Sequence, residues 1–154
     1  MNVEELIPHD GAMCLLDRVV EAGADFVETE LRVRRDGLFD DGHSVPAWLG
    51  LEYMAQAAAA WAGLRARDDG TARQVGFLLG TRCFTTSVAR LPCDTVLRVR
   101  ARQLAASEQG LATFDCELFD CNDNGGDGIH QQAVLSVYRP TDPEAQSNTQ
   151  DSPL

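Results

Sequence analysis

The chain has 154 residues, a length that predicts a single domain. Its 24 acidic and 13 basic residues give a formal net charge of −11, which argues against a nucleic-acid partner. Hydrophobic residues make up 44% of the chain, enough for a packed core. The most apolar stretch, 46–64, is interrupted by Glu52 and Gln56, so we expect no membrane span.

The cysteines, histidines and basic residues exclude several kinds of chemistry. Five cysteines stand at scattered spacings without a CxxC pair, and we interpret them as small buried thiols of a cytoplasmic protein. No two histidines have metal-ligand spacing and no glycine-rich phosphate loop is present, so we expect neither a metal nor a bound cofactor. All 13 basic residues are arginine, which excludes lysine as a Schiff base or general base.

The first elements that the pattern predicts are two strands. Residues 13–20 form an apolar run with a charged break, and residues 25–34 alternate with period two. Residues 22–25 between them predict a hairpin turn. Residues 35–45 contain Asp-Gly pairs and predict a loop.

A long helix is predicted over residues 46–67. Ser44 and Pro46 suit a helix start, and the Asp-Asp-Gly at 68–70 suits a stop. The segment is apolar nearly all round and rich in alanine, so we expect protein to cover it on nearly all sides. It contains one carboxylate, Glu52.

After the helix the pattern changes to strands, predicted at 75–79, 83–88, 95–104, 111–119 and 129–138. Residues 141–154 are polar and without periodicity, so we expect a disordered tail after a domain of residues 1–140. One helix with an antiparallel sheet is an α+β inventory. Because a single curved sheet cannot enclose a helix, we expect a second subunit to cover the rest.

Three motifs resemble bacterial 3-hydroxyacyl-[acyl carrier protein] dehydratases over about residues 6–140. The first is Pro8-His9 followed by Met-Cys-Leu-Leu-Asp-Arg-Val-Val at 13–20. The second is Pro-Ala-Trp-Leu-Gly-Leu-Glu-Tyr-Met-Ala-Gln at 46–56, which is most similar to the dehydratase subunits of aryl-polyene and xanthomonadin-type pigment clusters. The third is Phe84 followed by Leu-Pro-Cys-Asp-Thr-Val-Leu at 91–97.

This resemblance implies a hotdog fold, in which an antiparallel β-sheet wraps around one long central helix and the protein is a dimer. It implies dehydration of 3-hydroxyacyl thioesters to trans-2-enoyl thioesters, in fatty-acid or aryl-polyene-type biosynthesis. The substrate would arrive on the 4'-phosphopantetheine of an acyl carrier protein. A histidine and a carboxylate from opposite subunits would remove the water.

Glu52 is the candidate acid, because desolvation on an apolar helix favours a protonated carboxyl group. The alternative is a structural carboxylate paired with an arginine. Gln56 lies one turn later on the same face, where it would orient Glu52, hold a water, or serve as a core amide. Ala47 and Trp48 belong to the first turn, whose N–H groups would polarise the thioester carbonyl. The family has glycine where this chain has Ala47.

The base is marked less clearly. The family's histidine stands fourteen residues before the carboxylate, where this chain has Leu38. His43, nine residues before Glu52, is one candidate, and a solvated loop histidine is the alternative. His9 is a second candidate, with a structural role near the site as the alternative. We expect His130 to be exposed.

An acidic carrier protein would dock on a local arginine patch, and the alternative is that these arginines form the solvated face of a strand. The two candidate patches are Arg32, Arg34 and Arg35, and Arg98, Arg100 and Arg102. Three functions stay open. They are an active dehydratase, a non-catalytic hotdog subunit of a heterodimeric dehydratase, and an acyl-thioester thioesterase.

Overall fold

A computed structural model provides the structure and describes residues 2–7, 11–70, 77–122 and 128–138. Two 3-10 turns, eight strands and one α-helix are described in these ranges. In chain order they are η1 (Val3–Glu5), η2 (Gly11–Met13), β1 (Arg18–Ala22), β2 (Phe26–Arg32), β3 (Ser44–Pro46), α1 (Leu49–Asp68), β4 (Phe77–Thr86), β5 (Arg90–Pro92), β6 (Val96–Ala106), β7 (Leu111–Asp120) and β8 (His130–Tyr138).

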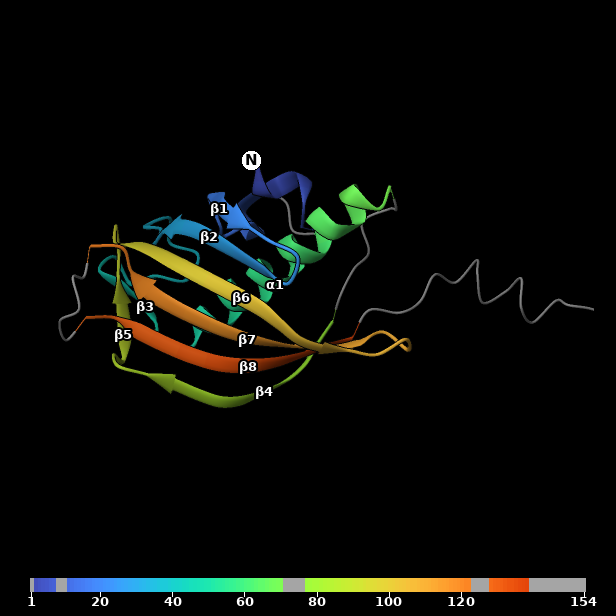
Figure 1. Ribbon diagram of the computed structural model, residues 1–154. Helices are drawn as coiled ribbons and strands as arrows, with labels where there is room; N and C mark the ends of the chain where they lie inside the picture. The colour runs from blue at the N-terminus through green and yellow to red at the C-terminus, as the bar shows by residue number, and fades with distance from the viewer. Residues whose placement is uncertain (1, 8–10, 71–76, 123–127, 139–154) are drawn as a thin grey trace, which may run out of the picture.

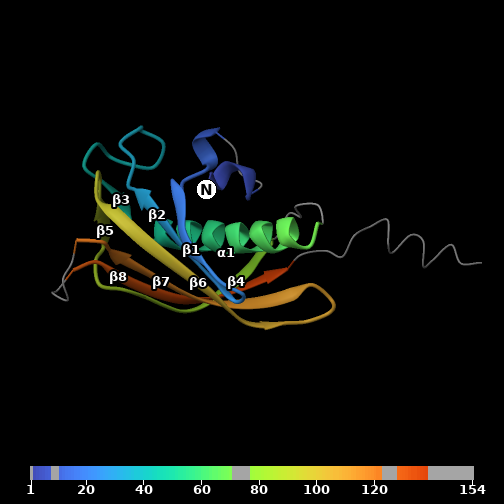
Figure 2. The same cartoon turned by 45° about the horizontal axis from the view of Figure 1, so that its top comes forward.

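Six strands form one antiparallel sheet in the order β1-β2-β6-β7-β8-β4. The sheet curves, and α1 lies along its concave side (Figures 1 and 2). The helix packs mainly against β6, then against β2 and β7, and least against β8. Short strands β3 and β5 pair in a separate sheet, and β3 leads the chain into the helix.

Alternation along the strands builds the core. Leu97, Val99 and Ala101 of β6 are buried against the helix, and the same period continues through Phe114 and Cys116 of β7. Apolar side chains on one face of a sheet must be shielded from water. The alternation of apolar and polar residues therefore determines the face of the sheet on which α1 packs.

The segment before β1 covers a second side of α1. Its buried side chains include Leu6, Ile7, Leu15 and Leu16. A Cβ atom at Gly63 would lie 2.1 Å from the Leu6 carbonyl oxygen, so glycine alone permits this close approach.

Two boundaries differ from those predicted. The helix begins at Leu49, and the supposed helix start at Ser44 and Pro46 is β3, because its main chain pairs with β5. The strands predicted at 75–79 and 83–88 are one strand, β4, over its described part. A bulge containing Cys83, with φ +56°, interrupts its alternation. The predicted tail, 141–154, lies outside the described residues.

One row of α1 stays uncovered in the single chain. Trp48, just before the helix, is 56% exposed, and Glu52, Ala55, Ala59 and Ala62 are half-buried. These five residues are called the open row below. The expectation that a second subunit covers the rest of the helix stays a prediction. No described helix has the length and apolar character needed to cross a membrane.

Candidate active site

Glu52 stands on the open row one turn before a buried amide. Gln56 is fully buried, and its Nε2 donates to Glu52 Oε1 at 3.0 Å. The spacing of four residues puts the two side chains on neighbouring positions of one helix, as predicted. Gln56 thus holds one carboxylate oxygen of Glu52, which is half-buried on the open row.

The same amide fixes the N-terminal segment. Gln56 Nε2 donates to the Met13 carbonyl at 2.8 Å, and its Oε1 accepts from the Leu15 N–H at 2.9 Å. Arg34 holds the segment from the other side, since its guanidinium donates to the carbonyls of Ala12 and Cys14. Two of the three expected roles of Gln56 are therefore compatible, because it is a core amide bonded to backbone and it also bonds Glu52. Its holding a water stays a prediction.

Two backbone N–H groups at the start of α1 have no acceptor within the described ranges, and the two that follow them do. The N–H groups of Gly50 and Leu51 donate to Ala47 and Trp48 in short 3-10 bonds of 3.0 and 2.9 Å. Within the described ranges, no acceptor contacts the N–H groups of Trp48 and Leu49. Unpaired N–H groups and the helix dipole together favour an oxygen that carries partial negative charge.

Ala47 is not one of these donors. Its N–H donates to the Ala89 carbonyl at 3.1 Å, so the expectation that this group is free for substrate is wrong. The Trp48 ring packs edge-on against Phe39, with ring centroids 6.4 Å apart. This places an aromatic surface at the start of the open row, and the substrate-binding roles of Ala47 and Trp48 stay predictions.

A second buried amide, Gln131, touches the same turn from β8. Its Nε2 donates to the Ala47 carbonyl at 2.9 Å and to Thr86 Oγ1 at 3.1 Å. Sequence reasoning missed this residue. The sequence indicated it only as a polar residue at a position of β8 that alternation turns inward, together with the buried Ala133 and Leu135.

The two histidines in the described ranges, His43 and His130, are both exposed. His43 is exposed, its N–H donates to Asp41 Oδ1, and its carbonyl accepts from Cys93. His130 begins β8, is exposed as predicted, and pairs with Glu117 at 3.1 Å. His9 lies outside the described residues, so its role stays a prediction.

The cavity beside the start of α1 is small. It measures about 10 Å³ and is lined in part by Leu15, Leu49 and Tyr53. That volume holds about one water molecule, whereas pockets for small organic ligands measure roughly 300 Å³ or more. An acyl or aryl chain therefore needs space that this cavity does not provide.

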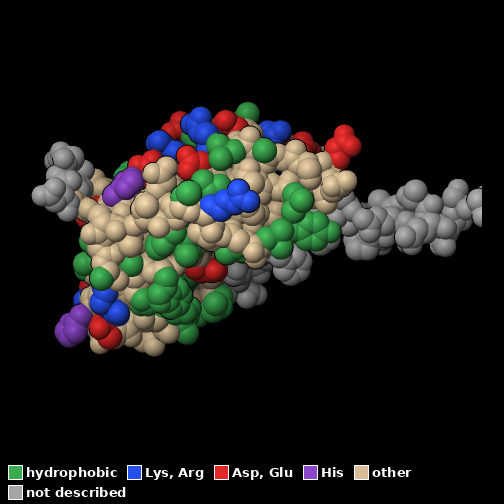
Figure 3. All heavy atoms as spheres, turned by 90° about the horizontal axis from the view of Figure 1, so that it is seen from below, with side chains coloured by type: hydrophobic (Ala, Val, Ile, Leu, Met, Phe, Trp, Pro, Cys, Tyr) green, Lys and Arg blue, Asp and Glu red, His purple; other side chains and the backbone are tan. Residues whose placement is uncertain are grey.

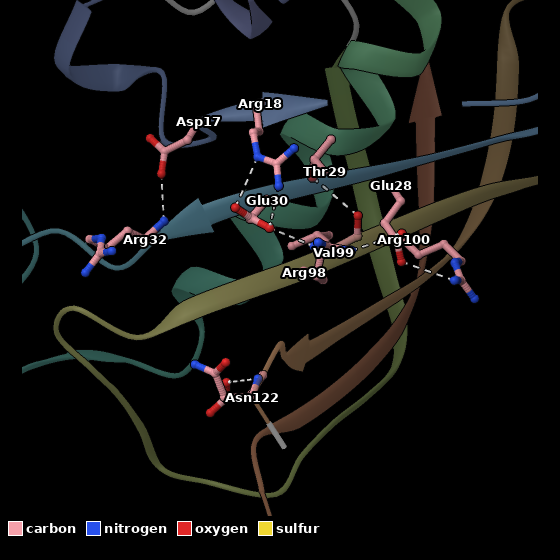
Figure 4. Close-up of polar contacts among 11 residues, drawn as sticks. Asp17, Arg18, Glu28, Thr29, Glu30, Arg32, Arg98, Val99, Arg100 and Asn122 are labelled. Atoms are coloured by element: carbon pink, nitrogen blue, oxygen red, sulfur yellow. Dashed lines mark hydrogen bonds and ion pairs between the residues drawn. The ribbon is translucent and has the colours of Figure 1, made fainter. Parts of the chain in front are cut away.

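Arginines on the outer face of the sheet are paired rather than free. Glu30 receives Arg18 at 3.0 Å and Arg98 at 2.9 Å, and Glu28 receives Arg100 at 3.1 Å, across β1, β2 and β6 (Figure 4). Hydrogen bonds from Arg18, then Arg98, hold the pKa of Glu30 below its usual range. Pairing of this kind supports the prediction of a solvated strand face over that of a docking patch.

In the other arginine cluster, Arg34 and Arg35 also have partners. Arg35 pairs with Asp94 at 2.8 Å and bonds the Gly42 carbonyl, while Arg34 holds the N-terminal segment. The open groove of about 480 Å³ beside them is lined by both signs of charge. Its lining residues are Asp17, Arg32, Val33, Arg34, Arg35, Asp36 and Asp94.

An apolar face lies on another side of the molecule. Viewed from below, hydrophobic side chains gather over its middle and charged side chains lie mostly toward its edges (Figure 3). The edge strand β4 exposes Leu78 and Leu79, 45% and 59% accessible. An exposed apolar patch beside an unpaired strand edge is typical of a protein–protein interface.

The cysteines carry no sign of a nucleophile. Cys14, Cys93 and Cys116 are buried as predicted, whereas Cys121 is partly exposed and Cys83 is exposed, contrary to the prediction. Burial raises the pKa of Cys116 to about 12, so this thiol stays protonated. Among the described side chains, no three His, Cys, Asp or Glu residues gather as metal ligands would.

Comparisons with known proteins show which family and which fold this chain resembles. A family model described as ApeP-like, ApeP dehydratase, matches residues 1–149. The dehydratase heterocomplex ApeI:P from Xenorhabdus doucetiae is similar with a TM-score of 0.81 and 26% identity, over 97% of this chain and 97% of that chain. The comparison with curated proteins gave no match.

More distant structures share the fold alone. Cj0977, a sigma28-regulated virulence protein from Campylobacter jejuni, has a TM-score of 0.60 and 12% identity, covering 91% of this chain and 89% of its own. A hypothetical thioesterase with coenzyme A from Streptococcus pneumoniae TIGR4 has a TM-score of 0.59 and 8% identity, covering 79% and 86%. The α+β hotdog prediction is confirmed, and the dimer stays a prediction.

Proposed function

The chain belongs to the ApeP-like dehydratase family, and on that premise we propose that it dehydrates 3-hydroxyacyl thioesters carried on the phosphopantetheine of an acyl carrier protein. The chain is a dehydratase, a hydro-lyase, rather than the thioesterase left open by its sequence. Aryl-polyene biosynthesis is the pathway that the ApeI:P likeness supports. The observation that carries the proposal is Glu52, held by Gln56 at 3.0 Å on the open row.

The residues fit the three demands of the reaction. A base removes a proton from the carbon beside the thioester carbonyl, an acid protonates the departing hydroxyl, and donors stabilise the enolate-like oxygen. We assign the acid to Glu52, whose proton leaves with the hydroxyl as water. We assign the donors to the Trp48 and Leu49 N–H groups, which stand at the start of the same helix.

We assign the base to His9 rather than to His43. His9 stands four residues before Met13, whose carbonyl shares the Gln56 nitrogen with Glu52. His43 is exposed, and its loop is fixed by main-chain hydrogen bonds, from the His43 N–H to Asp41 and from the Cys93 N–H to the His43 carbonyl.

We further propose that a second, different hotdog subunit covers the open row. The similar ApeI:P structure is a dehydratase heterocomplex, and the small side chains Ala55, Ala59 and Ala62 allow another helix to approach closely. A homodimer would bring together two chains with a net charge of −11 each, which favours a less acidic partner. A covering subunit would also enclose space for the acyl chain.

The test is product analysis with a 3-hydroxyacyl-phosphopantetheine carrier protein. The chain is assayed alone and with a co-expressed hotdog subunit from its own gene neighbourhood. Mass spectrometry distinguishes the enoyl product, lighter by one water, from a free acid. We expect the enoyl thioester, formed faster by the complex. Free acid, or no turnover in either sample, would overturn the proposal, and a chain that is fully active alone would overturn the heterocomplex.

A further inference from the structure

Gln131 is a buried amide that joins three elements at the start of α1. Its side chain is fully buried at the second residue of β8. The Nε2 atom donates to the Ala47 carbonyl at 2.9 Å, just before the helix, and to Thr86 Oγ1 at 3.1 Å, at the end of β4. The amide therefore ties the entry of the helix to two neighbouring strands of the sheet.

The oxygen of the same amide lies against Gly50. A Cβ atom at position 50 would lie 1.7 Å from Gln131 Oε1, far inside any allowed contact. A shift of the carboxamide away from position 50 would disturb the two bonds that its Nε2 donates. Glycine at position 50 is therefore the condition for seating Gln131 against the first turn.

This arrangement leaves a polar atom unpaired. Among the described residues, no donor bonds to Gln131 Oε1, although the atom is buried. An unpaired buried acceptor costs free energy, and an apolar side chain of similar length would avoid that cost. The amide is therefore explained by its Nε2 atom, which holds the Ala47 carbonyl next to the N–H groups of Trp48 and Leu49.

We propose that Gln131 is a positioning residue of the dehydratase site. By holding the Ala47 carbonyl and packing on Gly50, it sets the direction of the Trp48 and Leu49 N–H groups. The inference rests on the proposed function, in which those N–H groups receive the thioester oxygen. Donors act strongly only when they are fixed before the charge develops, so a loose first turn weakens catalysis more than binding.

The first test compares Gln131→Ala with Gln132→Ala in the complete enzyme. Gln132 is the matched control, because it is the next residue of β8, is exposed, and makes one long bond of 3.4 Å to Asp115. We expect Gln131→Ala to lower kcat by about tenfold or more with KM nearly unchanged. Unchanged kcat in a folded Gln131→Ala enzyme would overturn the proposal.

The second test asks whether Gly50 acts through Gln131. Gly50→Ala inserts a methyl group where the amide oxygen lies, so it should lower kcat about as much as Gln131→Ala. The double variant Gly50→Ala/Gln131→Ala should be no slower than Gln131→Ala alone, because the clash is gone. If the two losses of kcat multiply in the double variant, the proposed coupling between Gly50 and Gln131 is contradicted.

A third readout needs no turnover and separates this inference from the proposed function. The Gly50 and Leu51 N–H groups bond within the first turn at 3.0 and 2.9 Å. Their amide hydrogen exchange should quicken in Gln131→Ala and stay unchanged in Gln132→Ala. If exchange quickens in Gln131→Ala but the wild type makes no enoyl product, the proposed function fails, while the role of Gln131 in fixing the first turn holds. Unchanged exchange would refute that role.

Discussion

Gln56 Nε2 donates to Glu52 Oε1 at 3.0 Å across one turn of α1. The same nitrogen bonds the Met13 carbonyl, so the orientation of Glu52 depends on the N-terminal segment remaining in place. The helix, its carboxylate and the chain that follows His9 therefore form one connected unit.

Replacing Gln56 should reduce both stability and activity. Gln56→Leu removes the bond to Glu52 and leaves the Met13 carbonyl and Leu15 N–H unpaired. An unpaired buried group such as the Leu15 N–H costs about 1–3 kcal/mol, so unfolding in denaturant should show a loss of that order. Activity should fall by about tenfold in the protein that remains folded. Gln109→Leu, in an exposed turn, should change neither. A Gln56→Leu protein with normal stability and rate would contradict the role of this amide.

The three histidines should respond differently to substitution by asparagine. His9→Asn should lower kcat by about 100-fold or more, as expected for loss of a general base. His43→Asn should retain most activity, and so should His130→Asn, whose ring is exposed beside Glu117. Rates are measured in the reconstituted complex. Should His9→Asn keep its rate while a histidine of the partner subunit proves essential, the base belongs to the partner and the assignment is wrong.

Gly63→Ala should destabilise the fold although alanine favours helices. Alanine gains about 1 kcal/mol of helix propensity over glycine, but its Cβ would lie 2.1 Å from the Leu6 carbonyl oxygen. Relieving this overlap costs about 1–3 kcal/mol or more and loosens the N-terminal segment. Gly80→Ala is the control, because a Cβ atom added there would meet nothing within 4 Å. Thermal unfolding should show a lower Tm for Gly63→Ala alone, and an equal or higher Tm would refute the close contact.

Alkaline pH should destabilise the protein through Cys116. Burial raises the pKa of this thiol from 9.0 to about 12. Between these values the folded state keeps a proton that the unfolded state loses, so the free energy of unfolding falls as pH rises. One such group contributes up to about 1.4 kcal/mol per pH unit. Buried Tyr53, whose pKa burial also raises, adds a loss of the same sign.

Variants separate the contribution of Cys116. Cys116→Ala should show a shallower decline of stability between about pH 9 and pH 11 than the wild type, and Cys83→Ala, at an exposed site, should decline like the wild type. Stability curves in denaturant at several pH values provide the measurement. Identical slopes for Cys116→Ala and wild type would show that this thiol is not the source.

Sequence patterns predicted the fold well because they report burial. Period two located the strands, and the alanine-rich segment with Glu52 and Gln56 located the helix. Its start was misplaced because Ser44 and Pro46 suit a helix cap and an edge strand equally well. The Gln131 contact was invisible, since it joins residues 84 positions apart and depends on Gly50 lacking a side chain.

The role of Glu52 as the acid is tested most directly by the rate of enoyl thioester formation in the reconstituted complex carrying Glu52→Gln. Glutamine keeps the shape of the side chain but has no proton to give, and Glu21→Gln on exposed β1 is the matched control. We predict a loss of about 100-fold or more for Glu52→Gln, with unchanged Tm and complex formation, and a normal rate for Glu21→Gln. A Glu52→Gln complex that makes the enoyl product at the wild-type rate would contradict this role.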